Sequence, residues 1–397
     1  MMKKPEWLKV KIPTYPAFDD TLSVVRCNTI RTVCEDASCP NINECWKNKT
    51  ATFLMMGEYC TRNCGFCNIK SGRPLPIDEG EADRIAISIQ NLGIKYAVIT
   101  SVTRDDLPDG GASHFSHVIN RIREINPDIC IEILTPDFQE CMEEAIDTIL
   151  NRPFSKPPES DLMGGDMERR TAVYSIVHED SSTVSTKQKT YYGEFEKGSK
   201  AVPDVFGHNI EVVKEHHETV KRPPSSYKKS LEFLRLIKER SKELAIPLVT
   251  NPTVSELLEG ETARRTAEYS SVRQGDEYQK DECKYSSTVS TKQKTDYGVF
   301  GKRLIIKTGI MVGVGETKTN ILDCIEEVRA VGVDIMTIGQ YLPPSPKHHP
   351  LHRYVTPAEF EEYERYGQQI GIKIVAGPFV RSSYRAKEIY EELMGIM

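Results

Sequence analysis

The fold class is decided by three consecutive segments of the chain, ATFLMMG (51–57), EADRIAISIQNLG (81–93) and YAVITS (96–101). The first and third are short apolar runs, typical of strands that are buried on both faces. In the middle segment Ile85, Ile89 and Leu92 fall on one helical face, and Gly93 follows where a helix commonly ends. Strand, helix and strand in this order predict a βα unit in a parallel sheet.

The same alternation continues toward the carboxyl end. Further helical patterns are FSHVINRIREI (115–125), ECMEEAIDTIL (140–150), SYKKSLEFLRLIKERS (226–241), TNILDCIEEVRAVG (319–332) and PAEFEEYERYGQQIG (357–371). Further strand patterns are ICIEIL (129–134), PDVFGHNI (203–210), RLIIKTGIMVG (303–313), DIMTIG (334–339) and IKIVAG (372–377). Repeated βα units build a parallel sheet with helices outside, either a barrel or a doubly wound sheet. The pattern alone does not choose between the two.

Two polar segments, at about 152–201 and 250–303, interrupt this alternation. The decapeptide SSTVSTKQKT occurs at 181–190 and again at 286–295, each time downstream of RRTA. Connections of about fifty residues far exceed the usual ~4–6 residues. We expect one polar sequence inserted twice into exterior loops, flexible and without a catalytic residue. A recruited binding or oligomerisation arm is the alternative.

Charge and hydropathy exclude several classes of protein. The formal net charge of −6 argues against a broad, non-specific grip on nucleic acid. The first residues, MMKKPEWLKVKIPTYPAF, lack the apolar core of a secretory signal. No run approaches the ~18 apolar residues of a membrane span. We expect a cytoplasmic protein that has neither nucleic acid nor a membrane as partner.

The cysteines are unevenly distributed, because six of the eleven lie between Cys34 and Cys67. In a reducing compartment such a cluster is more often a metal site than a disulfide framework. The strongest signal is the C-x3-C-x2-C run Cys60-Thr-Arg-Asn-Cys64-Gly-Phe-Cys67, directly after the strand at 51–57. Three thiolates can hold three irons of a cubane cluster and leave the fourth iron open. A zinc site would usually need a fourth protein ligand, and no nearby His supplies one.

A second triplet, Cys34, Cys39 and Cys45, has the spacing C-x4-C-x5-C within VCEDASCPNINECW (33–46). This spacing alone is compatible with a loosely spaced zinc site. The other five cysteines are most simply small buried hydrophobes: Cys27, Cys130, Cys141, Cys283 and Cys324. We expect Cys324 to lie in the core, and Cys283, in the second insert, to ligate no metal.

With an aromatic residue before its last cysteine, the C-x3-C-x2-C run after a first strand resembles the radical S-adenosylmethionine superfamily. Together with the preceding C-x4-C-x5-C triplet it resembles the lipoyl synthase family. Segments along the whole chain, apart from the two inserts, are similar to that family: ITSVTRDDLPDGGASHF (99–115), EILTPDF (132–138), PDVFGHNIEVV (203–213), GIMVGVGET (309–317), DIMTIGQYLPPSPKHHP (334–350) and GPFVRSSYRA (377–386).

The resemblance implies an α/β fold, a partial (βα)6 barrel of the TIM type with an N-terminal extension. The extension, residues 1–50, would carry the auxiliary cluster ligands. The barrel would span 51–385, interrupted by the two inserts, and a C-terminal tail would follow at 386–397.

The resemblance also implies two 4Fe–4S clusters. Cys60, Cys64 and Cys67 would hold the cluster whose open iron binds S-adenosylmethionine, and reductive cleavage would give a 5′-deoxyadenosyl radical. Cys34, Cys39 and Cys45, with Ser383 as fourth ligand, would hold an auxiliary cluster that is the sulfur source. An alkoxide is a hard ligand for a thiophilic cluster, so it can leave when sulfide is given up. Without the resemblance, Ser383 would be an ordinary hydroxyl bonded to the backbone.

The implied activity is that of a sulfurtransferase. It would insert two sulfur atoms, at the sixth and eighth carbons of a protein-bound octanoyl-lysine, to give lipoyl-lysine. The implied partners are octanoylated lipoyl-carrier domains, those of 2-oxoacid dehydrogenases and the H protein of glycine cleavage, and an electron donor such as flavodoxin or ferredoxin. The rival predictions are another sulfur-inserting radical enzyme, such as a biotin synthase, and a non-catalytic metal-binding module.

Other residues give weaker signals. Asn209 and Glu211 follow a strand, where barrel enzymes place functional side chains, and either orient S-adenosylmethionine or have structural roles. The segment 103–106 also follows a strand and could contact cofactor or substrate. GVGE (313–316) is either a weak nucleotide-binding signal or a tight turn. His348 and His349 lie in a Pro-rich loop, and we interpret them as surface or substrate-loop residues.

Overall fold

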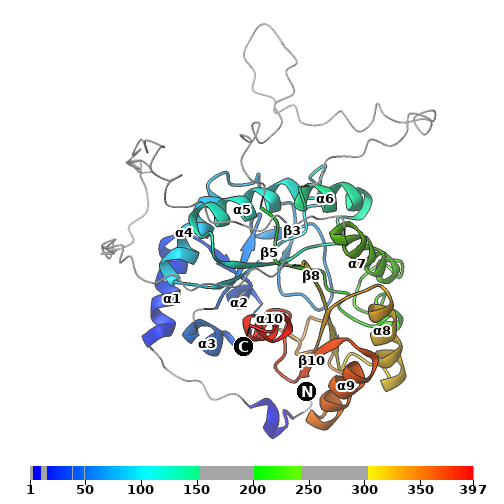
Figure 1. Ribbon diagram of the computed structural model, residues 1–397. Coiled ribbons are helices and arrows are strands. Elements are labelled where there is room, and N and C mark those ends of the chain that lie inside the picture. Colours follow the sequence, from blue (N-terminus) through cyan, green and yellow to red (C-terminus); the bar gives the residue numbers. More distant parts are fainter. Residues whose placement is uncertain are drawn as a thin grey trace, which may run out of the picture.

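The computed structural model describes residues 3–9, 16–37, 39–48, 50–151, 201–242 and 303–396. In this part of the chain an eight-stranded sheet has the order β1-β2-β5-β6-β7-β8-β9-β10 (Figure 1). Its strands are β1 (Arg31–Thr32), β2 (Thr52–Met55), β5 (Tyr96–Ser101), β6 (Cys130–Leu134), β7 (Val205–Gly207), β8 (Ile305–Val312), β9 (Ile335–Gln340) and β10 (Lys373–Gly377). All neighbours pair in parallel except β1, which is antiparallel to β2. The predicted α/β class with a mostly parallel sheet is confirmed.

In the described residues a helix follows each of the main-sheet strands β2, β5, β6, β7, β8 and β9 before the next strand of that sheet, which gives six βα units. The helices are α4 (Glu81–Leu92), α5 (Ala112–Ile125), α6 (Met142–Ile149), α7 (Ser226–Lys242), α8 (Lys318–Ala330) and α9 (Pro357–Ile370). Figure 1 shows them along the outer side of the curved sheet. The predicted end of the first of them is confirmed, since Gly93 caps α4 with a left-handed φ of 63°.

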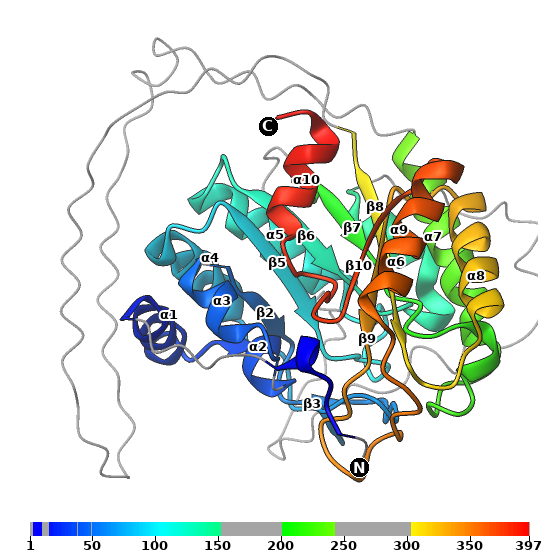
Figure 2. The same cartoon turned by 90° about the horizontal axis from the view of Figure 1, so that it is seen from below.

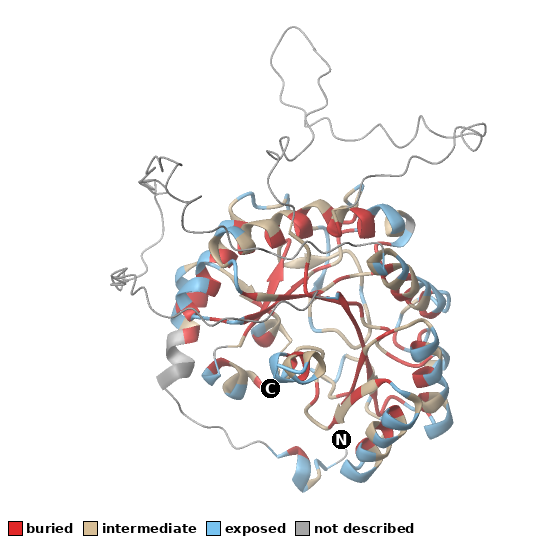
Figure 3. Ribbon diagram, viewed as in Figure 1, coloured by how far each residue is buried: buried red, intermediate tan, exposed pale blue. Residues whose placement is uncertain are grey.

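The main hydrophobic core lies between the sheet and these outer helices. Ile85 and Ile89 of α4 pack there with Phe53 of β2 and Ile99 of β5, and all four are fully buried. In Figure 3 the strands and the inward faces of the helices are red, while the outward faces of the helices are exposed. Cys324 of α8 is a buried member of this core, as the sequence predicted.

The inner side of the sheet has a separate core made with α10 (Ala386–Met394). Ile389 and Tyr390 of α10 pack against Tyr96, Val205 and Ile305, which stand at or near the start of their strands. The segment 386–397, expected from the sequence to follow the barrel as a C-terminal tail, contains this helix. Figure 2 places α10 toward the end of the sheet opposite to β3 (Tyr59–Cys60).

Glu132 and Lys307, each the third residue of its strand, form a buried ion pair on the inner side of the sheet. Lys307 Nζ is 2.9 Å from Glu132 Oε1, and the Tyr96 hydroxyl donates to Glu132 Oε2 at 2.5 Å. Glu132 and Lys307 are each at most 3% exposed. The amino-end half of the interior is therefore filled by α10 and this polar group, and the carboxyl ends of the strands remain for the candidate site.

The N-terminal region forms short helices beside β2 and α4. They are α1 (Pro16–Cys27), α2 (Val33–Asp36) and α3 (Ile42–Lys47). A small parallel pair, β3 with β4 (Lys70–Ser71), flanks the C-x3-C-x2-C loop. Short 3-10 turns occupy Glu6–Leu8, Gln139–Cys141 and Lys214–His216. No helix in the described ranges is long and apolar enough to cross a membrane. The two predicted inserts, at about 152–201 and 250–303, lie outside the described residues except for their last positions, 201 and 303. Cys283 also lies outside the described residues.

Candidate functional site

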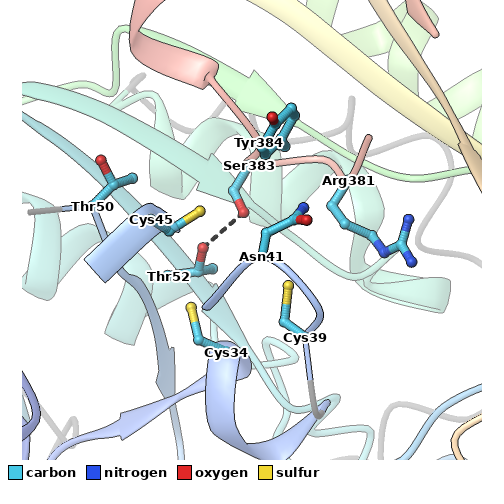
Figure 4. A pocket seen from close by; sticks show the side chains of 9 residues that line it. All are labelled: Cys34, Cys39, Asn41, Cys45, Thr50, Thr52, Arg381, Ser383 and Tyr384. Atoms are coloured by element: carbon cyan, nitrogen blue, oxygen red, sulfur yellow. Dashed lines mark hydrogen bonds between the residues drawn. The ribbon is translucent and has the colours of Figure 1, made fainter. Parts of the chain in front are cut away.

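The N-terminal triplet, Cys34, Cys39 and Cys45, surrounds a pocket. Two short helices and the turn between them position the three cysteines. Cys34 lies in α2, whose first turn is capped by the Thr32 hydroxyl accepting the Glu35 N–H at 3.3 Å. Cys45 lies in α3, and Cys39 lies between them. The pocket is lined by Cys34, Cys39, Asn41, Cys45, Thr50, Thr52, Arg381, Ser383 and Tyr384 (Figure 4). The three cysteines and Ser383, named together from the sequence, lie around one cavity.

The C-terminal segment reaches this pocket through hydrogen bonds that span the whole chain. The Thr52 hydroxyl donates to Ser383 Oγ at 2.8 Å, and Asn41 Nδ2 donates to the Phe379 carbonyl at 2.6 Å. The Tyr384 hydroxyl donates to Glu44 at 3.3 Å. Gly339 permits this approach, since a Cβ there would lie 2.1 Å from the Val380 carbonyl oxygen. The segment that carries Ser383 is thus fastened to the N-terminal extension.

The C-x3-C-x2-C loop is held mainly by backbone groups of neighbouring segments. Cys60 Sγ accepts the backbone N–H groups of Arg62 and Thr103, each at 3.4 Å. The Gly65 N–H donates to the Val220 carbonyl at 2.7 Å, and the Gly65 carbonyl accepts the His349 N–H at 2.7 Å. Loops that follow β5, β7 and β9 therefore clamp one short loop at the carboxyl ends of the strands.

His348 and His349, interpreted from the sequence as surface or substrate-loop residues, lie in a loop that contacts the cysteine loop. Both are half-buried, and the His348 ring lies 3.2 Å from the Cys67 carbonyl oxygen. The Tyr341 hydroxyl donates to the His349 carbonyl at 2.8 Å, which folds the Pro-rich loop back onto the cysteine loop.

Arg62, inside the cysteine loop, forms ion pairs with two carboxylates. Its guanidinium donates to Asp105 at 2.9 and 3.0 Å and to Asp137 at 2.6 Å. Burial alone would raise the pKa of Asp137, but the hydrogen bond and charge of Arg62 lower it to about 2. Within segment 103–106, Thr103 and Asp105 therefore hold the loop in place.

Asn209 and Glu211 follow β7 at the same end of the sheet. Asn209 Oδ1 accepts the Ser382 hydroxyl at 2.9 Å. Glu211 has a left-handed φ of 79°, fixed by β8: its N–H donates to the Gly309 carbonyl and its carbonyl accepts the Met311 N–H at 2.7 Å. Burial raises the pKa of Glu211 to about 7, against the opposing effects of Arg222 and Asn209. Backbone strain and a shifted pKa at one residue are typical of functional sites.

Burial affects the pKa of thiols in both triplets. Burial raises the pKa of Cys45 and of Cys67 to about 12, and ionisation of the neighbouring Cys34 would raise that of Cys45 further. A metal must therefore displace thiol protons on binding. Within the described ranges no group of three or more His, Cys, Asp or Glu converges on a single metal-ion position. Cubane thiolates each bind a different iron and need not converge in this way.

The donor set of the pocket fits a cubane cluster, since three thiols and one hydroxyl offer one ligand per iron.

The GVGE segment (313–316) is a tight turn: the Glu316 carboxylate accepts the N–H groups of Gly313 at 2.7 Å and Val314 at 2.9 Å. Sequence reasoning missed Thr52, Arg62 and Asp137, although Arg62 lies between two of the cysteines it had singled out.

Comparison with known proteins gives full-length relatives, although no family model matches the chain. A lipoyl synthase of Caldicellulosiruptor bescii is 35% identical over 402 residues, covering 100% of this chain and 99% of that protein. A lipoyl synthase of Caldicellulosiruptor saccharolyticus is 33% identical over 387 residues, covering 97% of both.

Solved structures give more distant similarities. Streptococcus suis SuiB bound to S-adenosylmethionine has a TM-score of 0.43 and 9% identity, over 85% of this chain and 53% of that chain. Methylornithine synthase (PylB) has a TM-score of 0.41 and 8% identity, over 82% of this chain and 70% of that chain. The assignment rests on the two full-length relatives, and by them the chain belongs to the lipoyl synthase family.

Proposed function

We propose that this chain is the sulfur-inserting enzyme of lipoyl formation, which converts a protein-bound octanoyl-lysine to lipoyl-lysine. The observation that carries the proposal is the meeting of Cys34, Cys39 and Cys45 with Ser383 around one pocket, which the C-x3-C-x2-C loop does not line. When bound, two 4Fe–4S clusters and S-adenosylmethionine would supply the radical and the two sulfur atoms inserted at the sixth and eighth carbons.

Each part of the chain has a role in this proposal. Cys60, Cys64 and Cys67 would hold the cluster that binds S-adenosylmethionine, and Asn209 and Glu211 would orient that cofactor. The hydrogen bond from Ser382 to Asn209 links the proposed cofactor side to the segment that carries Ser383, so the two proposed sites are neighbours.

The proposed domain plan follows from these roles. Residues 1–50 form the extension with the auxiliary ligands, 51–385 form a partial (βα)6 barrel, and 386–397 follow it. The curvature of the sheet and its six βα units support the barrel (Figure 1). An incomplete barrel would admit an octanoyl-lysine arm that remains attached to its carrier.

The proposed partners are octanoylated carrier domains of 2-oxoacid dehydrogenases and of the glycine cleavage H protein. A flavodoxin or ferredoxin would donate electrons, and the location would be the cytoplasm. Within the described part of the chain the cysteines form no disulfide, which supports a reducing compartment.

Iron and acid-labile sulfide analysis after anaerobic reconstitution tests the proposal. Two cubanes give about eight irons per chain, and replacing one triplet by Ala should leave about four. A colourless protein that binds zinc, or loss of all iron when either triplet is replaced, would contradict it.

A further inference from the structure

Thr52, the first residue of β2, contacts two of the groups that surround the auxiliary pocket. Its hydroxyl donates to Ser383 Oγ at 2.8 Å, drawn as the dashed line in Figure 4. Its backbone lies close to the Cys34 thiol: burial raises the pKa of that thiol, and the Thr52 backbone opposes the effect. Thr52 therefore lies between two ligand candidates: Cys34 of the N-terminal extension, and Ser383, which follows Thr52 by 331 residues in sequence.

The strand fixes where this hydroxyl lies. β2 is an inner strand, since it pairs with β1 on one side and with β5 on the other, where Thr52 is opposite Val98. Thr52 is only 6% exposed, and a β-branched side chain has few rotamers in a strand. The donor is thus pre-organised, whereas Ser383 lies in a loop between β10 and α10.

A fixed donor has two effects on an oxygen that is to ligate iron. It stabilises negative charge on Ser383 Oγ, which favours the deprotonated form that a metal binds. It also withdraws electron density from that oxygen, which weakens its bond to the metal and eases its departure. Hydrogen bonds to ligating groups orient them and tune the metal in this way.

We propose that Thr52 is a positioning residue, whose hydroxyl orients Ser383 as the fourth ligand of the auxiliary cluster and tunes its release. The inference rests on the proposed function, because it requires that Ser383 be that ligand.

The test is a double-mutant cycle in the full chain, read by Mössbauer and EPR spectra of the auxiliary cluster. The background Cys60→Ala, Cys64→Ala and Cys67→Ala removes the signal of the other cluster. The variants are Thr52→Val, which keeps the shape but loses the hydroxyl, Thr52→Ser, which keeps the hydroxyl, Ser383→Ala, and Thr52→Val with Ser383→Ala. Thr52→Ala replaces Thr52→Val if melting curves show that the latter does not fold.

Thr50→Val is a matched comparison from the same pocket. The Thr50 hydroxyl donates to the Asn48 carbonyl at 3.4 Å rather than to Ser383. Its spectrum should change less than that of Thr52→Val. An equal change in the two would overturn the inference, because any lost pocket hydroxyl would then suffice.

The expected result is that Thr52→Val changes the spectrum of the unique iron, Thr52→Ser restores it, and the double variant equals Ser383→Ala. In the otherwise native chain, Thr52→Val should lower lipoyl formation by about tenfold, near the lower end for a hydrogen bond to a charged acceptor. Formation of 5′-deoxyadenosine should continue.

Each contrary outcome has a distinct meaning. If Thr52→Val matches the parent, or adds its own change to that of Ser383→Ala, Thr52 does not act through Ser383 and the inference is wrong. If Ser383→Ala itself matches the parent, the ligand assignment within the proposed function fails first.

Discussion

The two cysteine triplets of this chain are supported in different ways. Cys60, Cys64 and Cys67 come from one loop of eight residues, held by backbone hydrogen bonds to loops that follow three strands. The auxiliary pocket is assembled from α2, α3 and a segment more than 330 residues further along the chain, and side chains close it.

The difference teaches that one site is built to be rigid and the other to be opened. The C-x3-C-x2-C loop is fixed by several backbone hydrogen bonds, so displacing it would break several of them at once. A hydroxyl at the end of a loop can be displaced while the sheet stays intact. This matches the proposed roles, in which one cluster is reused and the other gives up sulfide.

The largest expected effects separate the two triplets. Replacing Cys60, Cys64 or Cys67 by Ala should abolish both S-adenosylmethionine cleavage and lipoylation, because the cofactor loses its iron. Replacing Cys34, Cys39 or Cys45 should abolish lipoylation but leave some production of 5′-deoxyadenosine. Chromatography of both products measures this, and lipoyl product from an auxiliary-site variant would disprove the assignment of the sulfur source.

Smaller effects are expected at the two adjacent serines, Ser382 and Ser383. Ser383→Ala should reduce turnover strongly while the N-terminal triplet still holds some iron. Ser382→Ala should be milder, acting through Asn209, whose Oδ1 accepts the Ser382 hydroxyl. For Ser382→Ala we expect a few-fold rise in the KM for S-adenosylmethionine with little change in kcat. Equal activity of Ser383→Ala and the parent would return Ser383 to an ordinary hydroxyl.

Asp137→Asn should loosen the rigid site alone. It removes the buried charge that pairs with Arg62, at a cost near the lower end of ~3–5 kcal/mol because Arg62 is 21% exposed. Denaturant unfolding and the cleavage rate measure the loss, and iron in the auxiliary site should be unchanged. The control is Asp83→Asn, whose exposed pair with Arg121 should contribute at most about 1 kcal/mol. Equal losses would contradict the prediction.

Acid should weaken the loop after β7, which supports Gly65. Burial lowers the pKa of His217 to about 4, below the ordinary 6.5. Between pH 4 and 6.5 the unfolded chain binds more protons at His217 than the folded chain does. The free energy of unfolding therefore keeps its full contribution from neutral His217 above about pH 6.5 and loses it as the pH falls toward 4. His217→Gln should therefore flatten the dependence of the unfolding midpoint on pH over that range. An unchanged slope would mean that other groups dominate.

The smallest effect should come from the two inserts. Deleting about 154–200 and 252–302, with short Gly/Ser joins, should leave iron content and lipoylation within a few-fold of the parent. Closing a longer flexible loop costs only about 0.6 kcal/mol per doubling of its length. A deletion variant that holds both clusters but fails on its carrier protein would show that the repeats recruit the partner.

Local patterns made much of the fold predictable. The helix at 81–92 and its end at Gly93 need only apolar spacing and one glycine, and both are as expected. The strand predicted over 203–210 is shorter, because β7 ends at Gly207 and the chain turns to present Asn209 and Glu211. The seven parallel strands of the main sheet followed from repeated βα units, whereas the two-residue strand β1 and the pair β3–β4 were not predicted.

The contacts that complete the auxiliary pocket could not be predicted in this way. Thr52 is one residue of an ordinary apolar strand, and nothing near it in sequence indicates a partner at Ser383. The helix α10 was missed because its apolar residues face the strand starts inside the sheet, a surface that exists only after folding.

The position of α10 has a consequence for how Ser383 would behave as a ligand. The residues between Gly377 and Ala386 form a short tether whose two ends are anchored, one in β10 and one in the inner core. A side chain on such a tether keeps a high effective concentration at its site even after it has let go. Ser383 could therefore leave the iron by a local movement and return within the same molecule, without diffusion of a second ligand.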